Sequence, residues 1–190
     1  MKLLHLDSSI TGADSASRSL SAAIVRAIAA RSPDAEVTHR DLVADPLPHL
    51  TLAVLADPIA NEPLQDFLTS DVIVIGAGMY NFAVPSQLKA WIDRIIVAGQ
   101  TFRYTEHGPE PLAGGKRVVV ALTRGGLYSA GADCARFEHA ENYLRDVFGM
   151  LGIVPEFIIA EGLKLGKAAR EVALARALEQ AQAIAIPLAA

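Results

Sequence analysis

Five segments of the chain have the apolar, β-branched character of strands, and this character is most continuous in the third and fourth. They are KLLHLD (2–7), EVTHRDL (36–42), DVIVIGA (71–77), KRVVVALT (116–123) and EFIIAE (156–161). Strands of a parallel sheet that is covered on both faces need such runs. The pattern therefore predicts five buried parallel strands.

Between these segments, apolar residues recur at helical spacing. The stripes comprise Leu20, Ile24, Ala27 and Ile28; Leu88, Trp91, Ile92, Ile95 and Ile96; the stretch from about 137 to 150; and Leu174, Leu178, Ala181 and Ala185. Strands that alternate with helices form βαβ units. We expect an α/β, flavodoxin-like fold: a doubly wound five-stranded parallel sheet of order 2-1-3-4-5 with helices on both faces. No repeat or linker divides the chain, so residues 1–190 are expected to form a single domain.

Composition narrows the class of protein. With 52% hydrophobic and 20% charged residues, the 190-residue chain suits a globular α/β protein, and its apolar runs are too short to cross a bilayer. The N-terminal MKLLHLDSS lacks the apolar core and cleavage site of a signal peptide. The single Cys134 fits a reducing compartment, and a net charge of −4 gives no reason to expect nucleic acid. We expect a cytoplasmic protein with neither a membrane nor a nucleic acid as partner.

The segment after the first strand, DSSITGADSASRSLS (7–21), is dense in hydroxyl groups and leads into a helix. The N–H groups at a helix N-terminus, together with serine hydroxyls, suit a phosphate, and Arg18 could add a charge. The alternative is that Ser15 or Ser17 simply caps the helix. The segment has neither a Walker pattern nor GxGxxG, so the monophosphate of FMN fits it better than a triphosphate or pyrophosphate.

The segment after the third strand, GAGMYNFAVPSQLKAWID (76–93), places four unusual residues before a helix. An isoalloxazine ring needs apolar walls and a few donors at its polar edge, and Met79 to Phe82 offer both. The backbone N–H groups of Asn81 and Phe82 could donate near N5 and O4. Alternatively, Tyr80 and Phe82 only cap the core, and Asn81 only tolerates a left-handed turn.

The fourth strand ends in TRGGLYSAG (123–131). Right-handed crossovers bring the loops after strands 1, 3 and 4 to one edge of the sheet. Amides of Gly125 and Gly126 could there stabilise negative charge that develops at the N1/O2 edge of a flavin. A plain glycine turn is the alternative.

Two further features carry weaker signals. TFRYTEHGP (101–109) predicts a short strand or hairpin arm that exposes Phe102 and Tyr104 and covers either a pocket or a partner. His5, His39 and His49 form no recognisable metal-ligand pattern, so no metal is expected. There is also no GxSxG nucleophile.

Several of these motifs occur in an order that resembles the FMN-dependent NADH:azoreductase family. They are the serine loop, MYNF with QLK, TFRYTEHGPEPL, GKR and TRGG, and together they span nearly the whole chain. The resemblance implies non-covalent FMN and a homodimer with the site near the interface. By position, it assigns the cofactor to Ser9, Ser15, Ala16, Ser17, Met79, Tyr80, Asn81, Phe82, Thr123, Arg124, Gly125 and Gly126. Phe102 matches an aromatic residue on the substrate side.

The resulting hypothesis is an oxidoreductase that works by two-electron ping-pong transfer. NADH or NADPH is the expected donor and a quinone or azo compound the expected acceptor. Because the chemistry takes place on the flavin N5, no catalytic side chain is expected. Two alternatives remain open: an electron carrier similar to flavodoxin, and a binding module without flavin.

Overall fold

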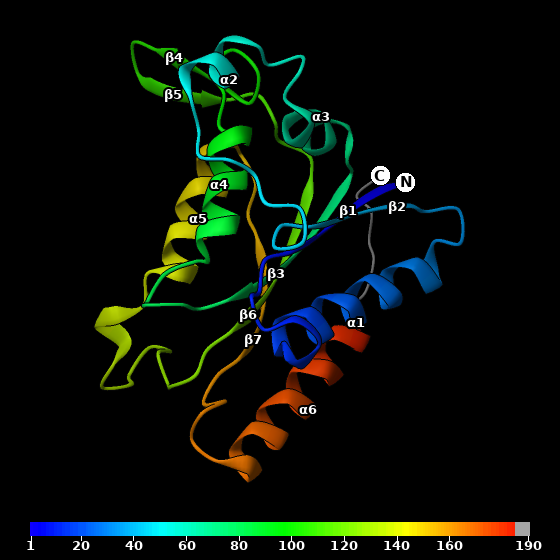
Figure 1. The fold of residues 1–190 in the computed structure, drawn as a ribbon, viewed down its shortest axis with the longest axis vertical. Coiled ribbons are helices and arrows are strands. Elements are labelled where there is room, and N and C mark those ends of the chain that lie inside the picture. The colour runs from blue at the N-terminus through cyan, green and yellow to red at the C-terminus, as the bar shows by residue number, and fades with distance from the viewer. Residues whose placement is uncertain (185–190) are drawn as a thin grey trace.

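The computed structural model describes residues 1–184 as a central sheet with helices on both faces (Figure 1). The strands are β1 (Lys2–Asp7), β2 (Glu36–Asp41), β3 (Val72–Gly78), β6 (Arg117–Thr123) and β7 (Glu156–Ala160). They are parallel and lie in the order β2-β1-β3-β6-β7. This is the predicted 2-1-3-4-5 order, and every strand agrees with its predicted segment to within one residue at each end. The fold prediction is confirmed.

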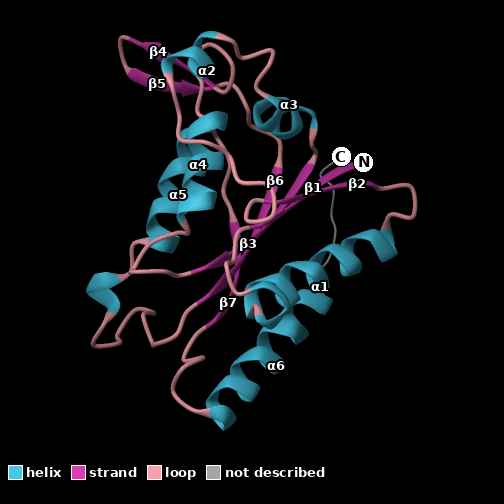
Figure 2. Cartoon of the chain, in the orientation of Figure 1, coloured by secondary structure: helices cyan, strands magenta, loops and turns pink. Residues whose placement is uncertain are grey.

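The helices form two layers (Figures 1 and 2). One face of the sheet is covered by α1 (Ala16–Arg31) and α6 (Lys167–Ala183). The other face is covered by α3 (Glu62–Thr69), α4 (Ser86–Ile95) and α5 (Ala140–Met150). The predicted helix at 137–150 begins three residues late, because a short 3-10 turn precedes it. Ala185 of the last stripe lies outside the described residues.

Two hydrophobic cores result from the alternation of side chains along the strands. Leu4 and Leu6 of β1 face α3, α4 and α5, whereas Leu3 faces α1 and α6. β3 is buried along its whole length, as expected for a central parallel strand. The prediction that all five strands are buried is wrong for β2. It lies at the sheet edge, and its first four residues are exposed.

A hairpin projects beyond the far end of α4, next to the short helix α2 (Leu52–Ala56) (Figure 1). It consists of β4 (Phe102–Thr105) and β5 (Gly108–Pro111), which pair antiparallel, so the predicted hairpin arm is confirmed. The expected exposure of both aromatic residues is wrong, since Phe102 is only 5% exposed and Tyr104 is 76% exposed. Phe102 opens the arm at its base, where its ring packs edge-on against Tyr104 at 5.1 Å.

No helix in the described part of the chain is both long and apolar enough to cross a membrane.

Candidate functional site

The segment after β1 prepares the N-terminus of α1 for an anion. Ser15 is the N-cap, and its Oγ accepts the N–H of Arg18 at 3.2 Å and lies 3.1 Å from the Ser17 hydroxyl. Within residues 1–184, the N–H groups of Ala16 and Ser17 have no hydrogen-bond partner. Unpaired N–H groups at a helix start attract phosphates. Ser15 therefore caps the helix, and the same turn still leaves donors for a ligand.

Arg18 holds the serine segment in place through hydrogen bonds and does not offer an uncompensated charge to a ligand. Its guanidinium donates to both carboxylate oxygens of Asp41, at 2.6 and 2.7 Å, and to the carbonyl oxygen of Ser9 at 2.9 Å. The hydrogen bonds from Arg18 hold the pKa of Asp41 well below its usual range. The charge of Arg18 is thus compensated by Asp41, and its hydrogen bonds fix the position of the serine segment.

The segment after β3 forms a tight two-residue turn. Tyr80 and Ala83 exchange paired backbone hydrogen bonds of 3.0 Å, and the residues between them have positive φ angles, 47° for Asn81 and 71° for Phe82. A left-handed conformation costs a residue with a bulky side chain about 1–3 kcal/mol. The N–H groups of Asn81 and Phe82 lack a partner in the described part of the chain, and these are the donors predicted for a flavin edge.

Aromatic rings and hydroxyl groups join this turn to its neighbours. The Phe82 ring stacks on Phe137 at 5.1 Å and meets Tyr128 edge-on at 6.3 Å. The hydroxyl of Tyr80 lies 3.0 Å from that of Ser9, which connects the loops after β3 and β1. Tyr80 therefore has a polar contact in addition to any packing role.

The loop after β6 leaves two more amides unpaired. The carbonyl groups of Gly125 and Gly126 accept the N–H groups of Lys164 and Gly162, both at 2.9 Å, while their own N–H groups have no partner among residues 1–184. The aliphatic part of Lys164 packs on Gly125 so closely that an added Cβ would lie 3.1 Å from its Cδ. The loop is thus held by its carbonyl side and keeps its donors available.

Arg124 precedes these glycines, and its side chain is completely buried. Its guanidinium pairs with Glu141 at 2.6 Å, Glu138 at 3.2 Å and Glu161 at 3.4 Å. Three carboxylates compensate its charge, so the side chain positions the loop and offers no free charge to a ligand.

The loops after β1, β3 and β6 surround one cavity of about 600 Å³. It is lined by every residue assigned to the cofactor from the sequence except Ser17, whose hydroxyl contacts Ser15 instead. The segment after β7 and the start of α6 also contribute, which sequence reasoning missed. Their lining residues are Leu163, Lys164, Leu165 and Arg170. The signal was present, because the carboxyl end of the fifth strand must lie at the same edge.

A second cavity of about 840 Å³ opens next to the first. It lies between the turn after β3, the start of α4 and one side of α5, and both cavities share Tyr80 and Asn81. Both volumes are in the range of small-molecule sites. Phe102 lines neither cavity of this chain.

Glu161 gives the site a pH-dependent support. Its Oε2 accepts the N–H groups of Tyr128 at 3.0 Å and Ser129 at 3.1 Å. Burial alone would raise the pKa of Glu161, but these hydrogen bonds and the charge of Arg124 outweigh burial and lower it below 4.5. The stabilisation is therefore complete above pH 4.5 and is lost as the pH falls through the lowered pKa.

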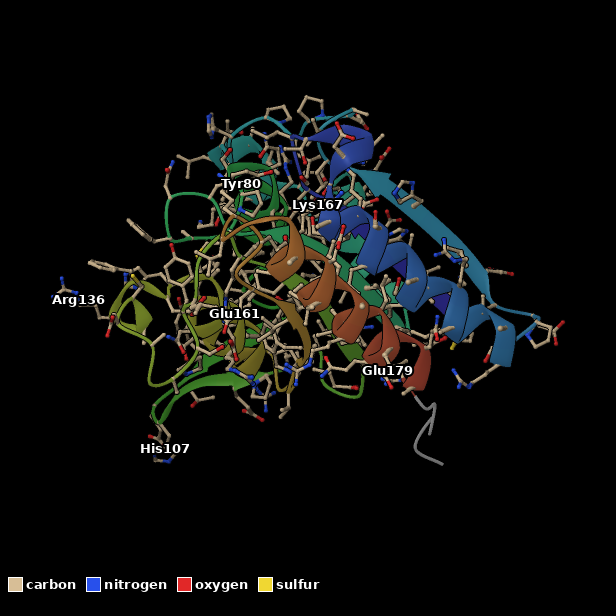
Figure 3. All side chains as sticks on the ribbon, turned by 90° about the horizontal axis from the view of Figure 1, so that it is seen from below. Tyr80, His107, Arg136, Glu161, Lys167 and Glu179 are labelled. Atoms are coloured by element: carbon tan, nitrogen blue, oxygen red, sulfur yellow. The ribbon has the colours of Figure 1, made fainter. Side chains whose placement is uncertain are left out.

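We expect Glu161→Gln to reduce the free energy of unfolding at pH 7 by about 1–2 kcal/mol, because hydrogen bonds to a charged group are weakened. This difference should shrink as the pH falls from 4.5 through the lowered pKa of Glu161, because the folded wild-type carboxylate itself becomes protonated there. Urea unfolding at several pH values measures it. Glu179, exposed on α6 and without a hydrogen bond or ion pair in the described chain, supplies the control Glu179→Gln (Figure 3). A difference that did not change with pH would contradict this account.

Comparison with known proteins supports the same assignment. A family model described as "Flavodoxin-like fold" matches residues 1–185. An FMN-dependent NADH:quinone oxidoreductase from Methylorubrum populi is 54% identical, over 97% of this chain and 98% of that protein. One from Rhizobium meliloti is 51% identical, over 93% of each.

Solved structures agree with these relatives. An azoreductase from Bacillus anthracis superposes with a TM-score of 0.88 at 26% identity, over 97% of this chain and 98% of that one. An FMN-dependent NADH-azoreductase from the same species, solved in complex with FMN, gives a TM-score of 0.83 at 25% identity, over 97% and 99%. With this fold, these loops and relatives above 50% identity over nearly its full length, the chain belongs to the FMN-dependent NADH:quinone oxidoreductase and azoreductase family of flavodoxin-like proteins.

Proposed function

We propose that this protein binds FMN without a covalent link and uses NADH or NADPH to reduce quinones or azo compounds by two electrons. The observation that carries the proposal is a set of backbone donors, unpaired within residues 1–184, that three different loops supply at the carboxyl edge of the sheet. They are the N–H groups of Ala16, Ser17, Asn81, Phe82, Gly125 and Gly126. Such preformed donors fit a ligand with a phosphate at one end and a polar heterocycle at the other.

The residues fit FMN in two groups. Ser9, Ser15, Ala16 and Ser17 would hold the phosphate at the start of α1, where the helix dipole favours negative charge. At the other end of the cavity, Met79, Tyr80, Asn81 and Phe82 would provide apolar surface and amide donors to the ring.

The loop after β6 would stabilise the reduced cofactor. Thr123, Gly125 and Gly126 would lie along the ring edge where negative charge grows on reduction, and amide donors stabilise such charge most in a site that excludes water. Arg124 would keep these amides in place through its three carboxylates. When bound, FMN supplies the hydride and electron chemistry, so the side chains bind and orient and none needs to act as a nucleophile.

The cavity beside the turn suits both the donor and the acceptor. It shares Tyr80 and Asn81 with the flavin cavity, so a planar molecule in it would lie next to the ring. If donor and acceptor use the same space, the first must leave before the second enters. Steady-state kinetics should then give parallel double-reciprocal lines, and intersecting lines would contradict the shared site.

A second copy of the chain is proposed to complete this site. The larger cavity opens between α4 and α5, and Tyr104 on the hairpin arm is exposed. We expect the arm of one subunit, including Phe102 at its base, to border the site of the other. Sedimentation at micromolar concentration should show a dimer.

We also propose that residues 1–190 act as one domain in the cytoplasm.

The visible spectrum of freshly purified protein tests the proposed activity. We expect a flavin spectrum that bleaches when NADH is added without oxygen and recovers when a quinone is added. Repeated turnover would exclude an electron carrier without enzymatic activity. A protein that stayed colourless after incubation with FMN and removal of the excess would overturn the proposal in favour of a binding module.

A further inference from the structure

Three side chains with metal-binding atoms meet on the α1 side of the sheet, behind the serine segment. His5 and Asp7 share one face of β1 because side chains alternate along a strand, and the parallel pairing with β2 places His39 directly beside His5. The ligand atoms of the three residues all lie within 4.8 Å of one another. His5 and His39 are far apart in the sequence, and only the strand register brings them together.

The distances resemble those around a metal ion. Nε2 of His39 lies 3.0 Å from Oδ2 of Asp7, and Nε2 of His5 lies 3.5 Å from Oδ1. Ligands about 2.0–2.2 Å from a tetrahedral ion are separated by roughly 3.4 Å. Each imidazole therefore presents a nitrogen to the carboxylate of Asp7 at nearly the distance that separates two ligands of one ion. Only small movements of the side chains would be needed for all three to bind an ion placed between them.

The charge balance also leaves room for a cation. Asp7 and Asp41 share the single guanidinium of Arg18, which binds Asp41 through two hydrogen bonds and lies 3.9 Å from Oδ2 of Asp7. The Asp7 side chain is only 7% exposed. A buried carboxylate is costly unless it is paired, and a divalent ion would give Asp7 a cation of its own.

Hydrogen bonds alone also join this cluster, and the 3.0 Å approach of His39 Nε2 to Asp7 Oδ2 is itself one of them. Ser21 Oγ donates to Oδ1 of Asp7 at 2.9 Å and lies 3.0 Å from Nε2 of His5. The His39 side chain is 48% exposed, so solvent and ions can reach the cluster from the sheet edge. An experiment must therefore distinguish two cases: the three side chains bind an ion, or they are only linked to one another by hydrogen bonds.

We propose that His5, Asp7 and His39 bind one divalent transition-metal ion of the zinc class, with water completing its coordination. Two imidazoles and one carboxylate form a donor set that Zn²⁺ accepts, and an open fourth position is common for it. The site is separate from the proposed flavin chemistry and does not require it. Because the ion would join β1 to β2, we expect its binding to raise the midpoint of thermal unfolding.

The test uses full-length protein without a histidine tag and with Cys134→Ser and His107→Gln as background. These changes remove an exposed thiol and the histidine at the hairpin tip, which points into solvent (Figure 3). Calorimetric titration with Zn²⁺ should give one ion per chain, and Co²⁺ should develop visible bands at the same stoichiometry. His39→Gln and His5→Gln should each weaken Zn²⁺ binding by about tenfold or more.

Ser21→Ala provides the matched control, because it removes the central hydrogen bond and keeps all three donors. It should retain binding of one Zn²⁺ per chain. The proposal is overturned if the background protein does not bind Zn²⁺ stoichiometrically, or if the His39→Gln protein, shown to be folded by its metal-free melting curve, binds it equally well. Zn²⁺ titrations with and without FMN should give the same affinity and stoichiometry. A chain that fails to bind flavin would therefore refute the proposed function without affecting the test of the metal site.

Discussion

Replacing Gly76 by alanine is expected to destabilise the protein by about 3 kcal/mol and to weaken FMN binding strongly. An added Cβ would lie 2.8 Å from Oδ1 of Asp7, 2.9 Å from Oγ of Ser21 and 3.2 Å from the backbone oxygen of Ser17. Side chains can rotate away, but the backbone of Ser17 belongs to the first turn of α1. The start of that helix must therefore move away from β3, and the proposed phosphate site moves with it.

Gly78 supplies the matched control for this prediction, because it lies two residues further along the same strand and itself lines the proposed flavin cavity. The nearest atoms to a Cβ there would be in the Tyr80 ring at 3.5 Å and the Thr123 hydroxyl at 3.6 Å, which are ordinary contact distances. We expect Gly78→Ala to change the free energy of unfolding by less than about 1 kcal/mol. Urea unfolding and FMN fluorescence titration compare the two proteins. If the two variants lost equal stability and equal FMN affinity, the close approach of α1 to β3 would not be the reason for glycine at position 76.

Arg124→Met should cause the second large loss, about 3–5 kcal/mol of unfolding free energy, because it leaves buried carboxylates without their shared cation. Glu138 is the most enclosed of these, and its carboxylate also accepts the N–H groups of Ala140 and Glu141 at the start of α5. The variant should therefore loosen both α5 and the Gly125–Gly126 amides, and FMN affinity should fall together with stability.

Arg145→Met tests whether burial is the cause. Arg145 pairs with the same Glu141, at 2.6 Å, but its side chain is 47% exposed. Exposed ion pairs contribute less than about 1 kcal/mol, so this variant should unfold at nearly the wild-type urea concentration. If chemical denaturation showed similar losses for Arg124→Met and Arg145→Met, the buried network would not be the source of the loop's rigidity.

Much of this architecture could be predicted because it depends on local patterns. Apolar runs identified the strands of the sheet, and five strands that alternate with helices fit the flavodoxin-like order. The handedness of crossovers then predicted which loops meet. The donors of Asn81 and Phe82 followed from the chemistry of a flavin edge, and among the residues that the structure describes these two N–H groups have no partner.

The remaining features depend on partners that are distant in sequence. The sequence contains Arg124 and Arg18 but does not show that the carboxylates of Glu138, Glu141, Glu161 and Asp41 occupy their guanidinium groups. Burial of Phe102 depends on how the base of the arm is anchored to the end of α4, where the Thr101 hydroxyl donates to the carbonyl oxygen of Ile95. The meeting of His5 and His39 depends on strand register, which no spacing rule along a single strand reveals.

The turn between Tyr80 and Ala83 has a consequence for how the protein matures. Its two left-handed residues are held by paired hydrogen bonds between the backbones of Tyr80 and Ala83, so the chain itself supplies the contacts that fix them. The conformational cost of these two residues is therefore part of the free energy of folding. Little conformational entropy of the turn remains to be lost when a ligand binds. A newly synthesised chain that has folded therefore already presents this turn in the conformation that the proposed cofactor needs.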